Sequence, residues 1–275
     1  MRPRTQSSSD TDSQAEFGSS RGGSGMPAPT VLMGSLCRTR SRRGPRTSPR
    51  LSHQRGDGGH DGEVTELSID PDLVVWSAEP AARRLHPLVI VMHGRGADER
   101  DLAGLFRMLP AGFVYASLRA PYAYGTGYAW FDDSVETPGD PRVSSADAMS
   151  DAVLAWVRHL PWQPTAIGAL GFSQGGAMAT HLLRQGRGIV SFAVNMSGFV
   201  VSGTHPSDAA LATSRPPAYW GRGSADPFFS HELIHRSDVW LGAHTTLTRA
   251  VYPGIGHWVS DEMLSDVCDF LTARL

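Results

Sequence analysis

Lysine is absent from this chain of 275 residues, so all 25 of its basic side chains are arginine. Without an ε-amino group, the chain has no Schiff-base nucleophile and no lysine for a phosphate-binding P-loop, which excludes enzymes that depend on either. Cysteine is nearly absent, with Cys37 in a polar segment and Cys268 near the end. This usage indicates no disulfide framework and is compatible with a reducing compartment, and neither cysteine is expected to be catalytic.

Long hydrophobic runs are also missing. A membrane span needs roughly 18 uninterrupted apolar residues, and the best run here covers only residues 88–92. Arg42 and Arg43 superficially suggest a twin-arginine export signal, but residues 44–48 contain no apolar segment after them. We therefore expect no membrane span and a cytoplasmic protein.

The charges are unevenly distributed. Residues 1–60 contain 10 arginines and 4 acidic residues, which leaves 15 basic and 23 acidic residues for the rest. Residues 1–62 are rich in Ser, Gly, Pro and Arg, and their only apolar patch, residues 31–33, is too short for periodic burial. We expect a disordered tail over 1–62 and one domain over 63–275. Because no aromatic residues interleave the arginine cluster at 38–50, no nucleic-acid partner is expected, and no pattern indicates an oligomeric state.

From residue 63 onward, short apolar runs alternate with helical periods. This alternation predicts an α/β fold with a mainly parallel sheet and helices on both faces. A helix is expected over residues 145–160, with Ser144 and Asp147 as its capping box, and another at the end of the chain. Residues 121–142 show no period and are expected to form a long loop. The expected strands are residues 73–76, 88–92, 114–118, 166–170, 189–195, 218–221 and 246–252.

Residues 171–175, Gly-Phe-Ser-Gln-Gly, match the G-x-S-x-G pattern, in which a tight turn between a strand and a helix presents a serine. Ser173 follows an expected strand and precedes a run of small residues that suits a closely packed helix. Residues 18–22 match the same pattern around Ser20, but neither a strand nor a helix flanks them. Context therefore favours Ser173 as a nucleophile and Ser20 as inert.

A serine nucleophile needs a base and a group that orients the base. Asp226 follows Ser173 after 53 residues, and His257 follows Asp226 after 31 residues, each just beyond an expected strand. Taken singly, an aspartate before proline is as often a turn former, and a histidine after glycine as often a loop residue. Their order and their positions after strands favour a catalytic triad of Ser173, Asp226 and His257.

The reaction of such a triad also needs hydrogen-bond donors for an oxyanion. The backbone N–H of Gln174, directly after the nucleophile, is one expected donor. The other is the N–H of Arg95, which follows the strand at 88–92 and lies between Gly94 and Gly96. The side chain of His93 is expected to be structural.

These motifs together resemble the phospholipase/carboxylesterase family of α/β-hydrolases, which includes bacterial carboxylesterases, lysophospholipases and acyl-protein thioesterases. The likeness covers roughly residues 65–275 and rests on five segments in the family's order. One departure is the arginine-rich tail, and another is Arg95, where an apolar residue is common. The segments are residues 93–98 (HGRGAD), 127–132 (GYAWFD), 171–176 (GFSQGG), 226–227 (DP) and 256–257 (GH).

The resemblance implies an α/β-hydrolase fold without a large cap domain, acting on small-molecule carboxylic esters or thioesters through an acyl-enzyme. It implies the triad and the two donors named above, no cofactor and no metal, and an acyl site along residues 127–131. Apolar residues near these motifs, with Phe199 among them, are candidates for the lining, although any of them could equally belong to the core. The expected substrate-binding residues are Gly94, Gly96, Trp130, Phe131 and Met178.

Two alternatives belong to other classes. His231-Glu232-x-x-His235 matches H-E-x-x-H, in which two histidines one helical turn apart bind zinc and the glutamate acts as a base. The glycine and third histidine of the longer zinc motif do not follow, since Leu241 stands at the position of the third histidine. A non-catalytic binding module on the same fold would lack part of the triad or the oxyanion loop, and no expected member is missing.

Overall fold

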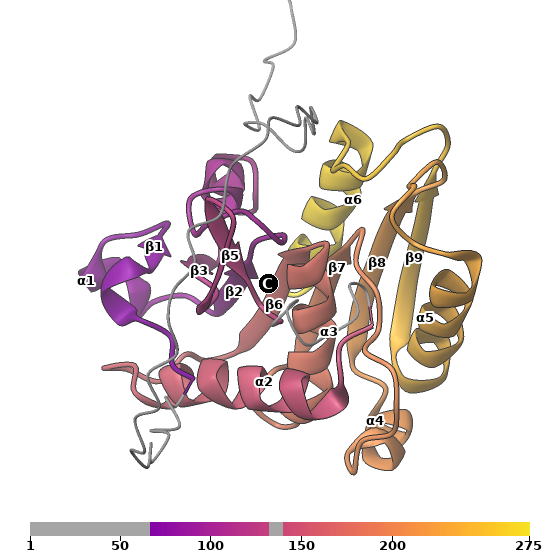
Figure 1. Ribbon diagram of the computed structural model, residues 1–275. Helices are drawn as coiled ribbons and strands as arrows, with labels where there is room; N and C mark the ends of the chain where they lie inside the picture. The colour runs from indigo at the N-terminus through magenta and orange to yellow at the C-terminus, as the bar shows by residue number, and fades with distance from the viewer. Residues whose placement is uncertain (1–66, 132–139) are drawn as a thin grey trace, which may run out of the picture. The chain divides into compact units, whose positions relative to one another are not determined.

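The computed structural model describes residues 67–131 and 140–275 of the chain. The tail expected over residues 1–62, its boundary with the following domain, and Ser20 all lie outside these residues. A sheet of seven strands in the order β1-β3-β2-β6-β7-β8-β9 forms the centre of the described part (Figure 1). The strands are β1 Val75–Trp76, β2 Leu88–Met92, β3 Val114–Leu118, β6 Ile167–Phe172, β7 Phe192–Met196, β8 Pro217–Gly223 and β9 Thr246–Tyr252.

The sheet is parallel except at β1, which pairs antiparallel with β3. Its central strands are buried along their whole length, as in β2, β3, β6 and β7. Strands covered on both faces need apolar side chains in both directions, which is why these segments are continuous apolar runs. The expected mainly parallel sheet is therefore confirmed.

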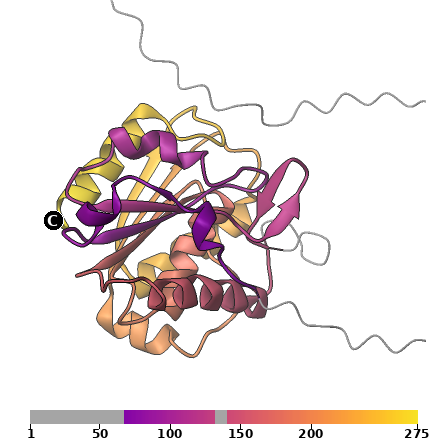
Figure 2. The same cartoon turned by 90° about the vertical axis from the view of Figure 1, so that its left-hand side faces the viewer.

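Helices cover both faces of the sheet. Figure 2 shows α2 on one side and α6 and η2 on the other. Helix α3 packs against β6, β7 and α2, and the guanidinium of Arg184 in α3 lies over the Trp240 ring of α5, so α3 and α5 share the face covered by α2. The principal helices are η2 Leu102–Arg107, α2 Val143–Arg158, α3 Gln174–Gln185, α5 His231–His244 and α6 Asp261–Thr272, and the shorter ones are η1 Pro71–Leu73, α1 Pro80–Arg83 and α4 Asp208–Ser214.

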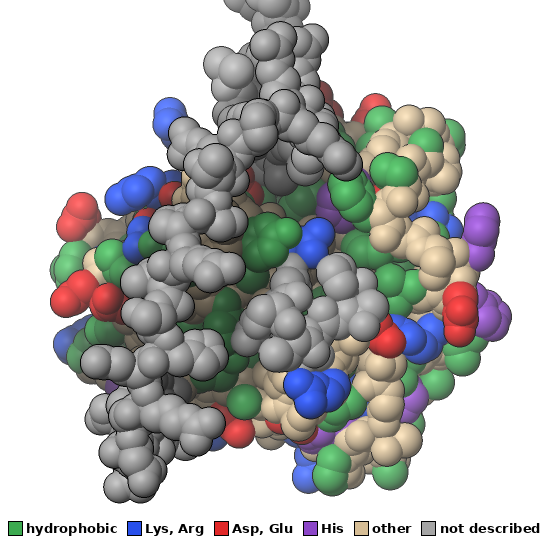
Figure 3. All heavy atoms as spheres, viewed as in Figure 1, with side chains coloured by type: hydrophobic (Ala, Val, Ile, Leu, Met, Phe, Trp, Pro, Cys, Tyr) green, Lys and Arg blue, Asp and Glu red, His purple; other side chains and the backbone are tan. Residues whose placement is uncertain are grey.

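The arrangement is that of an α/β-hydrolase, and no large cap domain occurs within the described residues. None of the helices in this part of the chain has the length and apolar character required to cross a bilayer. On the face drawn in Figure 3, basic side chains are scattered over several places and do not form one continuous stripe.

Four expectations about local structure are wrong. The strand expected over 189–195 begins only at Phe192, because the N–H groups of residues 189 and 190 bond back to Gly186 in the turn after α3. Helix α2 begins at Val143 with Arg142 as its N-cap, so Ser144 and Asp147 lie inside the helix and form no capping box. Strand β1 starts only at Val75, because Pro71–Leu73 forms a 3-10 turn before it. The long loop predicted over 121–142 contains a hairpin of β4 Tyr122–Tyr124 and β5 Gly127–Ala129.

The hairpin escapes sequence analysis because each strand has three residues, too few for a periodic signal. Its stability comes partly from a distant segment, since the Gly96 N–H donates to the Tyr128 carbonyl and the Tyr128 N–H donates to the Ala97 carbonyl. A side chain on Gly127 would collide with the Gly96 carbonyl. The hairpin therefore lies directly against the loop that follows β2.

Candidate active site

Ser173 lies in a sharp turn between β6 and α3. Its backbone has φ 56° and ψ −118°, a conformation that few non-glycine residues adopt. The turn is held by the Ser173 N–H, which donates to the Met196 carbonyl at 2.9 Å, and by the Ser173 carbonyl, which accepts from the Ala177 N–H at 3.0 Å. Strain of this kind persists where the surroundings enforce it, and it is frequent at functional sites.

The glycines of the turn are required by close backbone contacts. A Cβ on Gly171 would collide with the carbonyl of Gly175, and a Cβ on Gly175 would collide with the carbonyl of Met92 at the end of β2. The turn therefore packs tightly against both its own helix and the neighbouring strand. This packing holds the serine at the carboxyl end of the sheet, where α/β proteins bind ligands.

His257 and Asp226 meet Ser173 at this edge. The Nε2 atom of His257 lies 2.8 Å from the Ser173 Oγ, and its Nδ1 lies 2.6 Å from Oδ2 of Asp226. Asp226 comes from the loop after β8 and His257 from the loop between β9 and α6. The side chain of Asp226 is only 2% exposed and that of His257 12%. His257 is thus within hydrogen-bonding distance of both residues predicted to act with it.

The loop after β2 approaches Ser173 from the other side. A Cβ on Gly94 would lie 3.6 Å from the Ser173 Cβ, which shows how close this backbone comes to the serine. The Gly94 carbonyl accepts hydrogen bonds from the ring Nδ1 of His93 at 2.7 Å and from the Ala97 N–H at 3.2 Å. In a trans peptide the C=O and the following N–H point in opposite directions, so the Arg95 N–H faces away from these partners.

His93 fixes this peptide through both ring nitrogens. Its Nε2 accepts a hydrogen bond from the Ala120 N–H at 3.1 Å, so its proton resides on Nδ1, which donates to the Gly94 carbonyl. Burial lowers the pKa of His93 below its ordinary value, which maintains the neutral form that can accept from Ala120. The interpretation of His93 as a structural residue agrees with these contacts.

A second brace of this loop was missed by sequence analysis. The buried carboxylate of Glu99 accepts from the Nε and Nη2 of Arg119 at 2.6 and 2.7 Å, and the Nη1 of Arg119 donates to the Tyr128 hydroxyl at 3.1 Å. The Arg119 hydrogen bonds hold the pKa of Glu99 below its ordinary range. Loop and hairpin are therefore linked through the Arg119 side chain as well as by backbone pairing. In the sequence, only the opposite charges within residues 99–119 could have indicated this pair, and charge alone does not show which residues pair with each other.

Gln174 connects the serine turn to the segment after the hairpin. Its side-chain Oε1 accepts from the backbone N–H of Trp130 at 2.8 Å, and the Trp130 ring N–H donates to the His93 carbonyl at 2.8 Å. Beneath the turn, Asn195 accepts from the Gly198 N–H at 2.8 Å and donates to Thr180 at 2.9 Å. Asn195 was also missed, although a polar residue in an otherwise apolar strand is a usable signal.

The residues expected to line the substrate site separate into two groups. Gly94 and Gly96 lie in the loop beside Ser173, with Gly96 at φ 81°. Trp130, Phe131 and Met178, by contrast, are buried and belong to the hydrophobic core. Phe199 is buried in the same cluster, so these four side chains are core residues in this structure, and a lining role for Trp130, Phe131 and Met178 stays a prediction.

The H-E-x-x-H segment lies in the first turns of α5. His231 and His235 line a cavity of about 380 Å³ together with Arg222, Asp238 and Arg249, where Arg249 pairs with Asp238 at 2.6 Å. No group of three His, Cys, Asp or Glu side chains suited to a metal ion occurs in the described part of the chain. The two histidines thus have no third ligand there.

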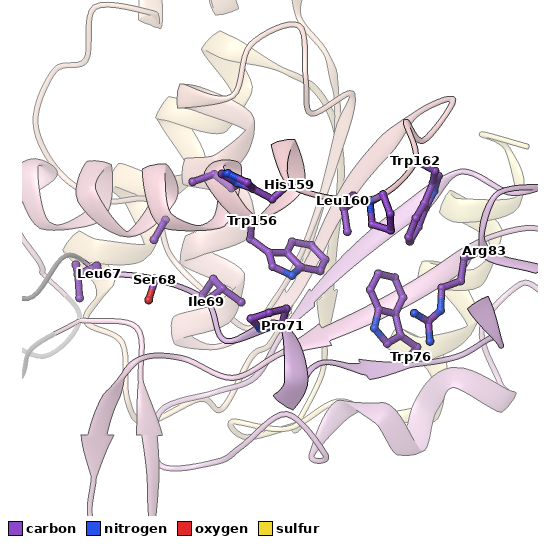
Figure 4. A pocket seen from close by; sticks show the side chains of 13 residues that line it. Leu67, Ser68, Ile69, Pro71, Trp76, Arg83, Trp156, His159, Leu160 and Trp162 are labelled. Carbon is purple, nitrogen blue, oxygen red and sulfur yellow. The ribbon is translucent and has the colours of Figure 1, made fainter. Parts of the chain in front are cut away.

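A cavity of about 590 Å³ lies apart from Ser173. Figure 4 shows the rings of Trp76, Trp156 and Trp162 along it, with Arg83 beside Trp76. The Arg83 guanidinium lies 4.2 Å from the centre of the Trp76 ring. None of the three residues Ser173, Asp226 and His257 lines this cavity.

The described site can be compared with known proteins. The family model named Phospholipase/Carboxylesterase matches residues 75–275. The chain belongs to this family. Members of the phospholipase/carboxylesterase family are hydrolases with the α/β-hydrolase fold, and the sheet order and the turn at Ser173 agree with that fold. A search of curated proteins gave no match.

Solved structures share the fold with this family member. Acyl-protein thioesterase 2 of Zea mays is 23% identical, with 73% of this chain and 98% of that chain covered and a TM-score of 0.57. A carboxylesterase from Mesorhizobium loti is 19% identical, with 75% and 99% covered and a TM-score of 0.62. The Bacillus cereus carboxylesterase is 17% identical, with 74% and 94% covered and a TM-score of 0.61.

Proposed function

We propose that the protein is a serine esterase that hydrolyses small-molecule carboxylic esters or thioesters through Ser173, His257 and Asp226. The observation that carries the proposal is the continuous pair of hydrogen bonds from Ser173 Oγ to His257 and from His257 to Asp226, at 2.8 and 2.6 Å. The family and the neighbouring carboxylesterases and thioesterase support the same reaction class.

In the first half of the reaction, Ser173 Oγ attacks the carbonyl carbon while His257 Nε2 takes its proton. Asp226 accepts from Nδ1–H, which keeps the proton on Nδ1, leaves Nε2 free as the base and stabilises the imidazolium that forms. The backbone N–H groups of Gln174 and Arg95 stabilise the negative charge on the former carbonyl oxygen. Collapse of this intermediate expels the alcohol or thiol, which takes the proton from His257.

In the second half, His257 takes a proton from water, and the resulting hydroxide attacks the acyl-enzyme. The carboxylic acid then leaves, and the proton on His257 returns to Ser173. No cofactor takes part in these steps. The braces at His93 and Glu99 support a rigid oxyanion loop, because preorganised donors need no rearrangement as charge develops.

The test is mutation of the nucleophile in the full chain. Ser173→Ala should abolish p-nitrophenyl butyrate hydrolysis and labelling by a fluorophosphonate while the circular dichroism spectrum stays that of the native protein. Ser20→Ala, in the second G-x-S-x-G match, is the matched control and should retain full activity. A Ser173→Ala variant with native activity would refute the proposal.

A parallel experiment addresses the zinc alternative. The double variant His231→Ala/His235→Ala and the native protein treated with a chelator should both retain esterase activity, because neither change touches Ser173 or His257. Loss of activity under both conditions, with no fluorophosphonate label on Ser173, would show that the reaction depends on a metal site in α5 and not on Ser173.

A further inference from the structure

Three phenylalanine rings surround the imidazole of His257. The ring centres of Phe172 and Phe228 lie 4.9 Å from the centre of the imidazole, and that of Phe229 lies at 5.3 Å. Phe172 is buried in β6, and Phe229 is partly buried against Phe199. Phe228 is 64% exposed, so of the three rings it is the one that offers most of its surface to another molecule.

The backbone of Phe228 is anchored by Asp226. Its N–H donates to Oδ1 of Asp226 at 3.0 Å, while Oδ2 of the same carboxylate contacts His257. One buried carboxylate therefore contacts the imidazole and anchors the backbone of the residue that carries the exposed ring. Exposing a large apolar ring to water is unfavourable, and a loop that holds one in this way beside the base suits contact with a ligand.

The chemistry determines which part of a substrate meets Phe228. During acylation the bond from Ser173 Oγ to the carbonyl carbon forms, and the bond from that carbon to the leaving oxygen or sulfur breaks. The proton taken from Ser173 passes from His257 Nε2 to the leaving atom, which must then lie about 3 Å from Nε2. A substituent that projects from that atom alongside the imidazole toward Phe228, whose ring is centred 4.9 Å from the imidazole centre, would contact the ring.

From this geometry, and resting on the proposed esterase function, we infer that Phe228 binds the leaving group and makes the protein favour substrates whose leaving alcohol or thiol is aromatic. Aromatic pairs in offset or edge-to-face contact are stabilised beyond the effect of buried area. A cationic leaving group could also bind a ring face, but both oxygens of Asp226 are already engaged and its side chain is only 2% exposed. This carboxylate, which bonds to the Phe228 backbone, therefore offers no ion pair to a cation.

The experiment compares butyrate esters that share the acyl group and differ in the leaving alcohol: benzyl, cyclohexylmethyl, 2-methoxyethyl and choline. Native protein and Phe228→Ala are assayed for kcat/KM on each ester. The substitution keeps the backbone N–H that bonds to Asp226. We expect the native protein to favour the benzyl ester, and Phe228→Ala to lower the benzyl to 2-methoxyethyl ratio about five- to tenfold.

The matched controls isolate the ring contact. Trp258→Ala removes another aromatic side chain, which is 41% exposed and adjacent in sequence to His257. Among the described residues, Trp258 has no ring contact with His257 like that of Phe228. The variant's benzyl to 2-methoxyethyl ratio of kcat/KM should therefore equal that of the native protein. Phe228→Tyr keeps an aromatic ring at this position and should retain the preference for the benzyl ester. All four esters form the same butyryl-enzyme, so its hydrolysis rate, measured in a single turnover, is independent of the leaving alcohol.

The outcomes are distinct. If Phe228→Ala lowers kcat/KM equally for all esters and also slows hydrolysis of the butyryl-enzyme, Phe228 positions His257 and the inference is wrong. A native preference for the cyclohexylmethyl or choline ester over the benzyl ester would also overturn it. Ser173→Ala is assayed in parallel: if the native protein hydrolyses none of the esters, or Ser173→Ala hydrolyses them, the proposed function itself fails.

Discussion

Arg184 and Asp208 form a bidentate ion pair near the end of α3, with Nε and Nη2 of the arginine 2.6 and 2.7 Å from the two carboxylate oxygens. The same guanidinium donates to the carbonyls of Val201 and Gly203, and its side chain is fully buried. Burial is the largest single influence on Asp208 and would raise its pKa, but the hydrogen bonds and charge of Arg184, together with the His205 N–H, lower that pKa below its ordinary value. The pair joins α3, which begins directly after Ser173, to the first residue of α4.

Loss of Arg184 should strongly destabilise the protein. Arg184→Met removes the arginine hydrogen bonds to Asp208 and to two carbonyls, and breaking a buried pair in this way costs about 3–5 kcal/mol. Arg236→Met is the control, because Arg236 pairs with Asp140 on the surface at 2.9 Å and such pairs contribute about 1 kcal/mol or less. Urea unfolding at pH 7 measures both free energies. Equal losses for the two variants would contradict this assignment.

Acid should destabilise the fold through His181. Burial lowers the pKa of His181 to about 4, although its hydrogen bond to Asp147 at 2.7 Å opposes the shift. In the unfolded chain the histidine has a pKa of about 6.5. Between these values the unfolded state binds a proton that the native state does not, so the stability present above pH 6.5 is lost as pH falls toward 4.

Thermal unfolding between pH 7 and pH 4.5 measures this effect. The Tm of the native protein should fall over this range, and His181→Gln should fall less because the titrating group is gone. His159→Gln removes an exposed histidine directly after α2 and serves as the control. If the native protein and His181→Gln show the same slope of Tm against pH, His181 is not responsible.

Removal of the His93 imidazole should impair the oxyanion loop. His93→Phe keeps a ring of similar shape but loses the bonds to the Gly94 carbonyl and the Ala120 N–H. Loss of a whole oxyanion donor lowers kcat about 100- to 1,000-fold, and a displaced donor should lower it about 10- to 100-fold. Steady-state kinetics with p-nitrophenyl butyrate measure kcat and KM separately. A change confined to KM would show that the loop does not serve the transition state.

Asp226→Asn should reduce kcat about ten-thousandfold without unfolding the protein, because an amide can donate to Nδ1 and so stabilise the tautomer that cannot act as a base. Asp261→Asn, at the start of α6, is the control and should retain activity. Single-turnover assays extend the measurement to slow rates. Activity within tenfold of native for Asp226→Asn would remove Asp226 from the mechanism.

Much of the fold is predictable because its physical causes are local. The bounds of β2, β3 and β9 agree with the expected strands, and α6, the helix expected at the end of the chain, buries Met263, Val267, Phe270 and Leu271. A strand covered on both faces must be apolar throughout, and a helix covered on one face must be apolar at every third or fourth position. Such patterns are visible without knowledge of any partner.

The features that were missed depend on partners distant in sequence. The hairpin pairs with the loop at Gly96, Glu99 meets Arg119, and Asn195 fits under the serine turn. Burial is equally non-local: the sequence does not show that Trp130 and Met178, whose role near the substrate stays a prediction, are packed in the core. Nothing in the residues themselves distinguishes an apolar side chain that lines a pocket from one that fills the interior.

By itself, the sequence determined the strand-turn-helix around Ser173 and the order of Ser173, Asp226 and His257 along the chain, because glycines and apolar runs act through neighbouring residues. Only the tertiary structure decided that His257 lies 2.8 Å from a serine 84 residues away and that Phe228 stands exposed beside it. Parallel strands end at one edge of the sheet, and this shared edge brings separate loops to one point. The distances between the side chains on these loops depend on how the loops pack, which no single segment specifies.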